Sequence, residues 1–205
     1  IFRSEYLAEF VDDGGAVFSN LSEVCILNNF QVYNSNEKYY AAIDLGNMQD
    51  FTCLTILNQR GECVFIYRNN RMDWQTMINE IRSILNTWRP ITYIEVNGIG
   101  DPVFNFLQKG CLAKLIPFVT TNLSKQQIIE ELILAFNEKR IKLPTKKLFE
   151  PLYDELETYT FEYSPVKRMV VYKALPSFHD DSVQSLAMAN HCLNEQKSKP
   201  KLRIL

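Results

Sequence analysis

The strongest constraint on the fold is an alternation of strand-like and helix-like segments through the middle of the chain. Asp73 precedes a segment whose apolar residues recur every three or four positions until Pro90, as on one face of a helix. An apolar run at 91–96 follows, and after a second helical segment another apolar run occupies 115–119. The order strand, helix, strand predicts parallel strands joined by a right-handed crossover. The predicted fold class is therefore α/β.

The later helices carry their own boundary signals. Asp101 is the expected cap of the second helix, Pro102 its first residue, and Gly110 its end. Ser124, with Gln127 three positions later, predicts a capping box that opens the third helix.

Further strands are predicted on both sides of this unit. Three strand-like runs precede the first helix, at 39–44, 51–57 and 63–68. Two more predict an antiparallel hairpin that turns near Ser164 and Pro165, at 158–163 and 169–175. We therefore expect a mixed sheet of five or more strands flanked by helices, with an added hairpin. The expected divisions are a lead-in arm, a main domain and a basic tail, at 1–36, 37–195 and 196–205.

Composition limits the class of protein. A chain of 205 residues that is 46% hydrophobic and 22% charged suits one globular domain with a sizeable core. No apolar run approaches the roughly 20 residues of a membrane span, and no basic-then-apolar leader opens the sequence, so we expect a cytoplasmic protein that contacts no membrane. The net charge of −2 argues against binding nucleic acid through charge alone.

Acidic residues follow two of the predicted strands and open the last helix. Asp44 ends the run at 39–44, Glu95 follows an apolar run, and Asp180 and Asp181 stand where the last helix begins. If the two strands are neighbours, their carboxyl ends bring Asp44 and Glu95 together, and Asp180 can approach from the helix. Clustered carboxylates raise one another's pKa unless a cation neutralises them, and oxygen ligands favour Mg²⁺ or Mn²⁺. The acids therefore predict a divalent-metal site for phosphoryl transfer.

Two of the acids also have a structural interpretation, whereas Glu95 would be costly in a buried position without a partner. Asp180 could act as an ordinary helix cap, and Asp44 could be a turn residue. His179 could serve as a general base, although a hydrogen-bonded helix-entry histidine is the simpler interpretation. Lys125, at the start of a helix, could contact a phosphate or could simply be exposed.

The acids lie within three longer motifs, at 42–46 with 50–52, at 94–100, and at 178–183 with 185–187. Segments 6–10 and 14–18 precede them. In this order the motifs resemble the nuclease domain of the large terminase subunit of tailed bacteriophages, which has an RNase H-like fold. The resemblance covers nearly the whole chain.

The resemblance implies roles for the acids. Asp44, Glu95 and Asp180 would be the catalytic, metal-holding triad, with Asp181 as a further ligand. With DNA as substrate, the phosphate that Lys125 could contact would be a DNA phosphate. It implies an endonuclease that uses Mg²⁺ or Mn²⁺, with two ions, to cut concatemeric double-stranded DNA in the host cytoplasm. The implied partners are an ATPase domain upstream in the same polypeptide, the small terminase subunit and the portal. The chain has no GxxxxGK[ST] loop, so that ATPase must precede it or be absent.

Other functions share parts of this pattern. A resolvase or transposase of the same nuclease-like fold would keep the acid triad without the terminase-like lead-in. A nucleotide-binding domain of the actin and sugar-kinase type would need glycine-rich turns late in the chain, and no glycine follows Gly110. An inactive interaction module would leave the acids as an uncompensated cost in stability.

Overall fold

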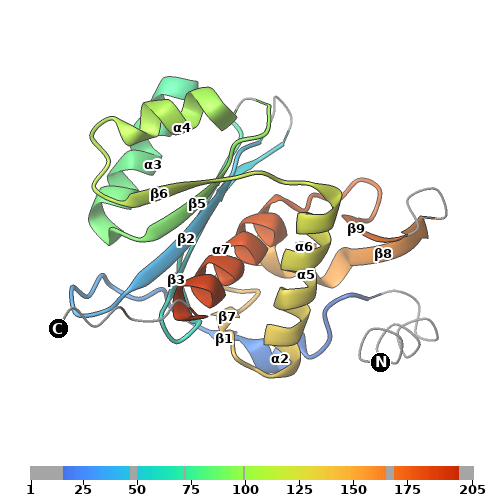
Figure 1. Ribbon diagram of the computed structural model, residues 1–205. Coiled ribbons are helices and arrows are strands. Elements are labelled where there is room, and N and C mark those ends of the chain that lie inside the picture. Colours follow the sequence, from blue (N-terminus) through green and yellow to red (C-terminus); the bar gives the residue numbers. More distant parts are fainter. Residues whose placement is uncertain (1–15, 47–49, 72, 99, 165–168, 199–205) are drawn as a thin grey trace.

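A mixed five-stranded sheet forms the centre of the protein. The computed structural model describes residues 16–46, 50–71, 73–98, 100–164 and 169–198. The strand order is β4-β3-β2-β5-β6 (Figure 1). These strands are β2 (Tyr39–Asp44), β3 (Thr52–Asn58), β4 (Cys63–Asn69), β5 (Ile91–Glu95) and β6 (Lys114–Phe118). β2 pairs antiparallel with β3 and parallel with β5, and β5 pairs parallel with β6, which confirms the predicted mixed sheet.

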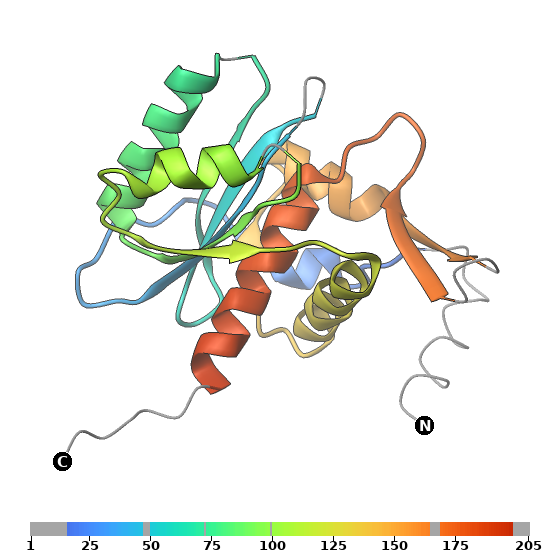
Figure 2. The ribbon, with the colours of Figure 1, turned by 45° about the horizontal axis from the view of Figure 1, so that its top comes forward.

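Helices cover both faces of the sheet (Figures 1 and 2). One face carries α3 (Trp74–Trp88) and α4 (Gly100–Gln108), and the other carries α5 (Asn122–Asn137), α6 (Glu150–Thr158) and α7 (Asp181–Ser198). β2 alternates between the two cores, since Ala41 and Ile43 pack toward α3 while Tyr40 and Ala42 pack toward α7. Burial on both faces is expected of a central strand. Among the described residues, no helix has the length and apolarity needed to cross a membrane.

Small side chains let α7 lie close to the sheet. The hydroxyl oxygens of Thr55 and Ser185 are 2.6 Å apart, and Cys53 Sγ lies 3.7 Å from Ser182 Oγ. Cys53 is the register partner of Asp44 in the β2–β3 pair. The contact between Ser182 and Cys53 therefore sets the start of α7 beside the end of β2.

The helix starts confirm one sequence prediction and correct two. Asp73 caps α3, and its Oδ1 accepts the N–H of Thr76 at 3.0 Å. The cap of α5 is Thr121 rather than Ser124, because Thr121 and Ser124 each accept the other's backbone N–H. The expected capping box at Ser124 and Gln127 is thus wrong by one turn. α4 begins at Gly100, so Asp101 lies inside the helix instead of capping it.

Residues 16–36, predicted to belong to a lead-in arm, pack into the domain in the structure. α2 (Leu21–Val24) leads into β1 (Cys25–Leu27), which pairs parallel with β7 (Leu143–Pro144). Val17 and Phe18 are buried in the core beside α5 and α6. Residues 1–15 lie outside the described part of the chain, so an arm from an upstream domain stays a prediction.

The predicted hairpin is confirmed at the other end of the sequence. β8 (Tyr159–Ser164) pairs antiparallel with β9 (Met169–Ala174) as a separate two-stranded sheet. Its expected turn residue Pro165 lies outside the described residues. Of the predicted basic tail, 196–198 continue α7, while 199–205 are likewise outside the described part.

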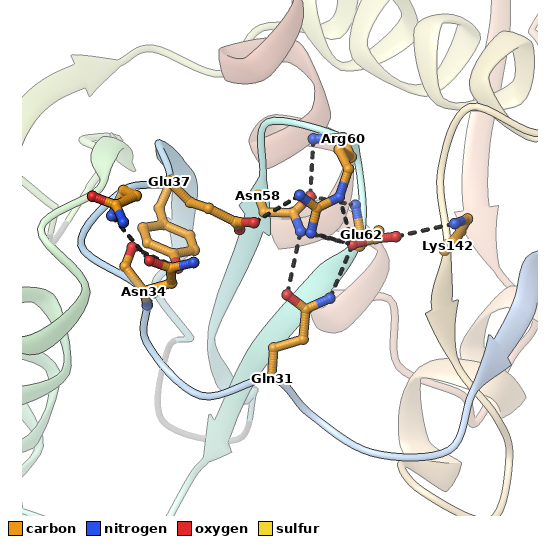
Figure 3. Close-up of polar contacts among 9 residues, drawn as sticks. Gln31, Asn34, Glu37, Asn58, Arg60, Glu62 and Lys142 are labelled. Atoms are coloured by element: carbon orange, nitrogen blue, oxygen red, sulfur yellow. Dashed lines mark hydrogen bonds and ion pairs between the residues drawn. The ribbon is translucent and has the colours of Figure 1, made fainter.

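A network of polar side chains closes the end of the sheet where β3 turns into β4 (Figure 3). We call it the Glu62 cluster; its members are Gln31, Asn58, Arg60, Glu62 and Lys142. Glu62 Oε2 accepts hydrogen bonds from Gln31 and Asn58, each at 2.9 Å, and Oε1 lies 3.0 Å from Lys142 Nζ. Burial raises the pKa of the Glu62 carboxyl, but these donors and Arg60 outweigh it and lower the pKa to about 2. The cluster therefore joins residues from three distant parts of the chain around one ionised carboxylate.

Candidate metal centre

The predicted acids meet at the opposite end of the sheet. Asp44 is the last residue of β2 and Glu95 the last residue of β5. The two strands are parallel neighbours, and Ile43 pairs with Ile94 one position before the acids. The expectation that Asp44 and Glu95 end adjacent strands at one edge is thus confirmed by the strand register.

Asp44 is surrounded by other carboxylic acids. Desolvation, a hydrogen bond with Glu95 and the charges of Glu95, Asp181 and Asp180 all raise the pKa of Asp44 well above its usual value. The structure therefore brings all four predicted acids within electrostatic reach of one another. Such a group is stable only with a stored proton or a neutralising cation.

Asp180 stands immediately before α7, where its backbone carbonyl accepts the N–H of Gln184 at 2.8 Å. The backbone N–H groups of Ser182 and Val183, which a cap residue would bind, donate to Glu155 instead of to Asp180. Asp180 Oδ2 lies 3.1 Å from Lys125 Nζ and accepts a longer bond of 3.4 Å from the Gln184 side chain. Asp180 thus occupies the cap position without making the usual cap hydrogen bond, and Lys125 supplies the neutralising charge.

Asp181 is the first residue of α7 and is buried. Its Oδ2 accepts the backbone N–H of Phe51 at 3.2 Å and lies 3.5 Å from His179 Nδ1. Burial raises the pKa of Asp181, the Phe51 N–H opposes that shift, and the charge of Asp180 adds to it. The His179 ring also packs edge-on against the Phe51 ring, with 5.0 Å between the ring centroids. His179 is therefore a helix-entry residue that contacts both Asp181 and Phe51.

Lys125 lies in the first turn of α5, and about a third of its side chain is exposed. The sequence left open whether Lys125 contacts a phosphate or is simply exposed; in the structure it pairs with Asp180. The predicted phosphate contact stays a prediction, since no nucleic acid is described.

The donor set fits a hard divalent cation. The four acids offer only carboxylate oxygens, which are the ligands that Mg²⁺ and Mn²⁺ prefer. Across the described residues, however, no three acidic, histidine or cysteine side chains already converge as a finished metal cage. The ion pair between Asp180 and Lys125 accounts for part of this difference, because it holds one carboxylate toward α5.

After β2, the backbone of Asp50 lies close to Gly46. A Cβ atom at this position would lie 2.5 Å from the backbone oxygen of Asp50, closer than real Cβ atoms approach. The Gly46 N–H also donates to Thr52 Oγ1 at 3.1 Å. Glycine at this position therefore lets the chain return from Asp44 to Phe51, whose N–H reaches Asp181.

Two residues beside the acids were not predicted from the sequence. Glu155 of α6 is buried and accepts the N–H groups of Ser182 and Val183, at 2.8 and 3.2 Å. Arg68 of β4 pairs with Glu155 at 3.1 Å. One signal was available: Glu155 follows Leu152 by three positions and precedes Leu156, which places it on the apolar stripe of its helix.

The sequence and the fold are similar to those of known proteins. No protein-family model matches the chain. The large terminase subunits of Thermus virus P23-45 and Thermus phage G20c are each 26% identical to it over 199 residues, which cover 92% of this chain and 40% of theirs. The crystal structure of the large terminase nuclease from the thermophilic phage G20c aligns with a TM-score of 0.76 and 22% identity, over 86% of this chain and 98% of that one.

The chain has the fold of a terminase nuclease. The predicted resemblance to the nuclease domain of phage large terminases is confirmed, and with it the RNase H-like architecture. The chain spans about two fifths of the length of the curated relatives that it matches. A structure of the G20c nuclease with bound magnesium is equally similar, with a TM-score of 0.76.

Proposed function

We propose that this chain is the metal-dependent endonuclease domain of a phage large terminase, cutting concatemeric double-stranded DNA during genome packaging. The observation that carries the proposal is the crowding of four carboxylic acids at the carboxyl ends of β2 and β5 and the start of α7. Two nucleases of similar fold support it, since the G20c enzyme has been crystallised with magnesium and the Sf6 enzyme with manganese.

The four acids would share the cation between strands and helix. Asp44 and Glu95 would hold it from neighbouring strands, and Asp180 and Asp181 from the first residues of α7. When bound, one or two Mg²⁺ or Mn²⁺ ions would polarise the phosphodiester and lower the pKa of the attacking water. If Asp180 turned toward the cation, its ion pair with Lys125 would open, and the ammonium group would then be free for a DNA phosphate.

The proposal extends to the rest of the packaging machinery. An ATPase domain upstream in the same polypeptide, the small terminase subunit and the portal would be the partners, in the cytoplasm of the host cell. The length of the relatives supports the first of these, because their large subunits extend well beyond the region that this chain matches.

Plasmid cleavage tests the proposal directly. The purified chain should nick or linearise supercoiled plasmid with Mn²⁺ or Mg²⁺ and should not do so with EDTA. Asp44→Asn and Asp180→Asn should each reduce cutting by more than about 100-fold, because losing even a residue that only supports a metal ligand costs 10- to 100-fold. Circular dichroism should show both variants folded.

Glu62→Gln is the matched control. It removes a carboxylate from the other end of the same sheet and should leave cutting unchanged at temperatures where the variant is folded. Cutting by Asp44→Asn at the wild-type rate, or undiminished cutting in EDTA, would overturn the proposal.

A further inference from the structure

The start of α7 is capped by a residue from another helix. The side chain of the residue before a helix usually accepts the N–H of the second or third helical residue. In α7 those residues are Ser182 and Val183, and both N–H groups donate to Glu155 Oε2. Glu155 Oε1 also lies 3.1 Å from the Ser182 hydroxyl oxygen. Glu155 thus makes the hydrogen bonds that Asp180 would make in an ordinary helix.

Buried surroundings fix Glu155 in this position. Only 4% of the residue is exposed, so its charge needs a partner. Arg68 of β4 provides it, at 3.1 Å and with 14% of its own side chain exposed. The α7 N–H groups and Arg68 together leave Glu155 little freedom to turn elsewhere.

The same arginine reaches the loop that follows Asp44. The Arg68 guanidinium lies over the Phe51 ring, 3.3 Å from its centroid. The backbone N–H of Phe51 in turn donates to Asp181 at 3.2 Å. A continuous chain of contacts therefore runs from α6 through β4 and this loop to α7, and it ends on the acids.

We propose that Glu155, held by Arg68, is a positioning residue for the metal site. By satisfying the first turn of α7 from outside, it leaves the carboxylates of Asp180 and Asp181 available to a cation. This inference rests on the proposed function, since it assigns a supporting role for the same metal. Without Glu155, the N–H groups of Ser182 and Val183 would lose their acceptor, and the carboxylate of Asp180, which stands at the cap position, would fold back onto the helix to accept them.

Metal affinity is the decisive measurement. Glu155→Met, which keeps the length of the side chain but has no carboxylate or amide oxygen to accept the Ser182 and Val183 N–H groups, should weaken Mn²⁺ binding to the 205-residue chain, measured by titration calorimetry, by about 10-fold or more. Plasmid cutting should need correspondingly more Mn²⁺ to reach half its maximal rate, while the rate at saturating Mn²⁺ stays near that of wild type. A variant that was merely less stable would not lower the Mn²⁺ affinity while keeping the wild-type rate at saturating Mn²⁺.

Two controls isolate the effect. Asp154→Asn changes the neighbouring residue of α6, whose carboxylate pairs at the surface with Lys146 at 2.7 Å, and should leave Mn²⁺ affinity unchanged. Leu85→Ala opens a cavity in the core beneath α3, on the other face of the sheet, and should lower the melting temperature without changing Mn²⁺ affinity.

The outcomes distinguish the two proposals. A wild-type chain that neither binds Mn²⁺ nor cuts would overturn the proposed function. A wild type that binds and cuts, beside a Glu155→Met variant with the same Mn²⁺ affinity, would overturn the positioning role and leave the metal site standing. Should Glu155→Met fail to fold because it leaves Arg68 unpaired, the double variant Glu155→Met with Arg68→Met removes both buried charges together. We expect the same 10-fold loss of Mn²⁺ affinity in the double variant. A double variant with the Mn²⁺ affinity of the wild type would again refute the positioning role.

Discussion

Glu62 and Asp44 are carboxylic acids at opposite ends of the same sheet, and their neighbours shift their pKa values in opposite directions. Asn58, Gln31 and two cationic side chains surround Glu62 and lower its pKa to about 2. Asp44 is desolvated and has three further acids around it, and both effects raise its pKa well above the usual value. The difference lies in the partners that the fold supplies and not in the kind of residue.

The comparison separates acids that hold a fold together from acids that serve a site. Glu62 has its full complement of donors within the protein, so its charge contributes to stability. The described neighbours that act on the pKa of Asp44 are acids, so a cation would be needed to stabilise it as a carboxylate. Perturbed acids of the second kind mark functional sites more often than chance allows.

The largest effect should come from adding metal. We expect Mn²⁺ at about 100 times its dissociation constant to stabilise the wild type by about 2.7 kcal/mol, because it binds the folded state alone. The melting temperature should rise by about 5 to 10 °C in a chain of this size. Differential scanning fluorimetry with and without EDTA measures it. The Glu62→Gln variant should show the same rise and Asp44→Asn none; equal rises in all three would show that Mn²⁺ binds elsewhere.

Removing the charge of Glu62, at the other end of the sheet from Asp44, should destabilise the protein. Glu62→Gln loses its pairing with Arg60 and Lys142, and we expect a cost of about 2 kcal/mol in the free energy of unfolding. The pKa shift alone implies more, but about half of each cationic side chain is exposed and water screens it. Urea denaturation at pH 7 tests this. An unchanged midpoint would mean that the Glu62 cluster is not a stabilising feature.

The same cluster should make stability depend on acid pH. The pKa of Glu62 is lower in the folded state, so its contribution is present above about pH 4.5, the ordinary value, and is lost as the pH falls toward 2. The stability difference between wild type and Glu62→Gln should therefore shrink by about 1 kcal/mol between pH 5 and pH 3. A difference that stays constant over this range would show that the charge of Glu62 is not what stabilises the wild type.

Asp44→Asn should stabilise the protein in the absence of metal, whereas Glu62→Gln should destabilise it. The amide removes one of several crowded carboxylates and can still donate a hydrogen bond to Glu95. We expect the melting temperature in EDTA to rise by about 2 to 4 °C, the shift that 1 kcal/mol produces at this chain length. Loss of stability would mean that Asp44 is already well satisfied and that the contrast with Glu62 is mistaken.

Lys125 should show the smallest effect on stability. Its pair with Asp180 is partly exposed, so Lys125→Gln should cost less than about 1 kcal/mol. If Lys125 contacts a DNA phosphate as predicted, the variant should also reduce the slope of log affinity against log salt by about 1. Titrations of duplex DNA in EDTA at several salt concentrations provide that slope. An unchanged slope would leave Asp180 as its partner and exclude the phosphate contact.

The fold followed from the sequence because its strongest signals are local. The apolar period before Pro90 and the strand-like runs on either side gave the order of elements, and the Asp73 cap was predicted from its position alone. The α5 start was wrong because Thr121 and Ser124 offer competing caps, and only the folded backbone shows which pair of N–H groups is satisfied. β1 and β7 were missed because each is too short to carry a periodic pattern.

The site was predictable as far as strand ends define it. Asp44 and Glu95 could be placed together, since parallel neighbours bring their carboxyl ends to one edge. The helical side was harder to predict, because whether Asp180 caps α7 depends on a competitor about 25 residues away in another helix. Arg68 gave no signal, since an arginine near the end of an edge strand is usually solvated.

Capping from a distant helix also affects the order in which the molecule folds. A helix with its own cap can begin to form before it docks, whereas the first turn of α7 gains its acceptor only when α6 is in place. Asp44, Glu95 and the α7 acids are also far apart in sequence, so their assembly requires long loops to close first. We expect the carboxylates to come together only in the last stage of folding. The repulsion between them would then arise only after the surrounding core has formed.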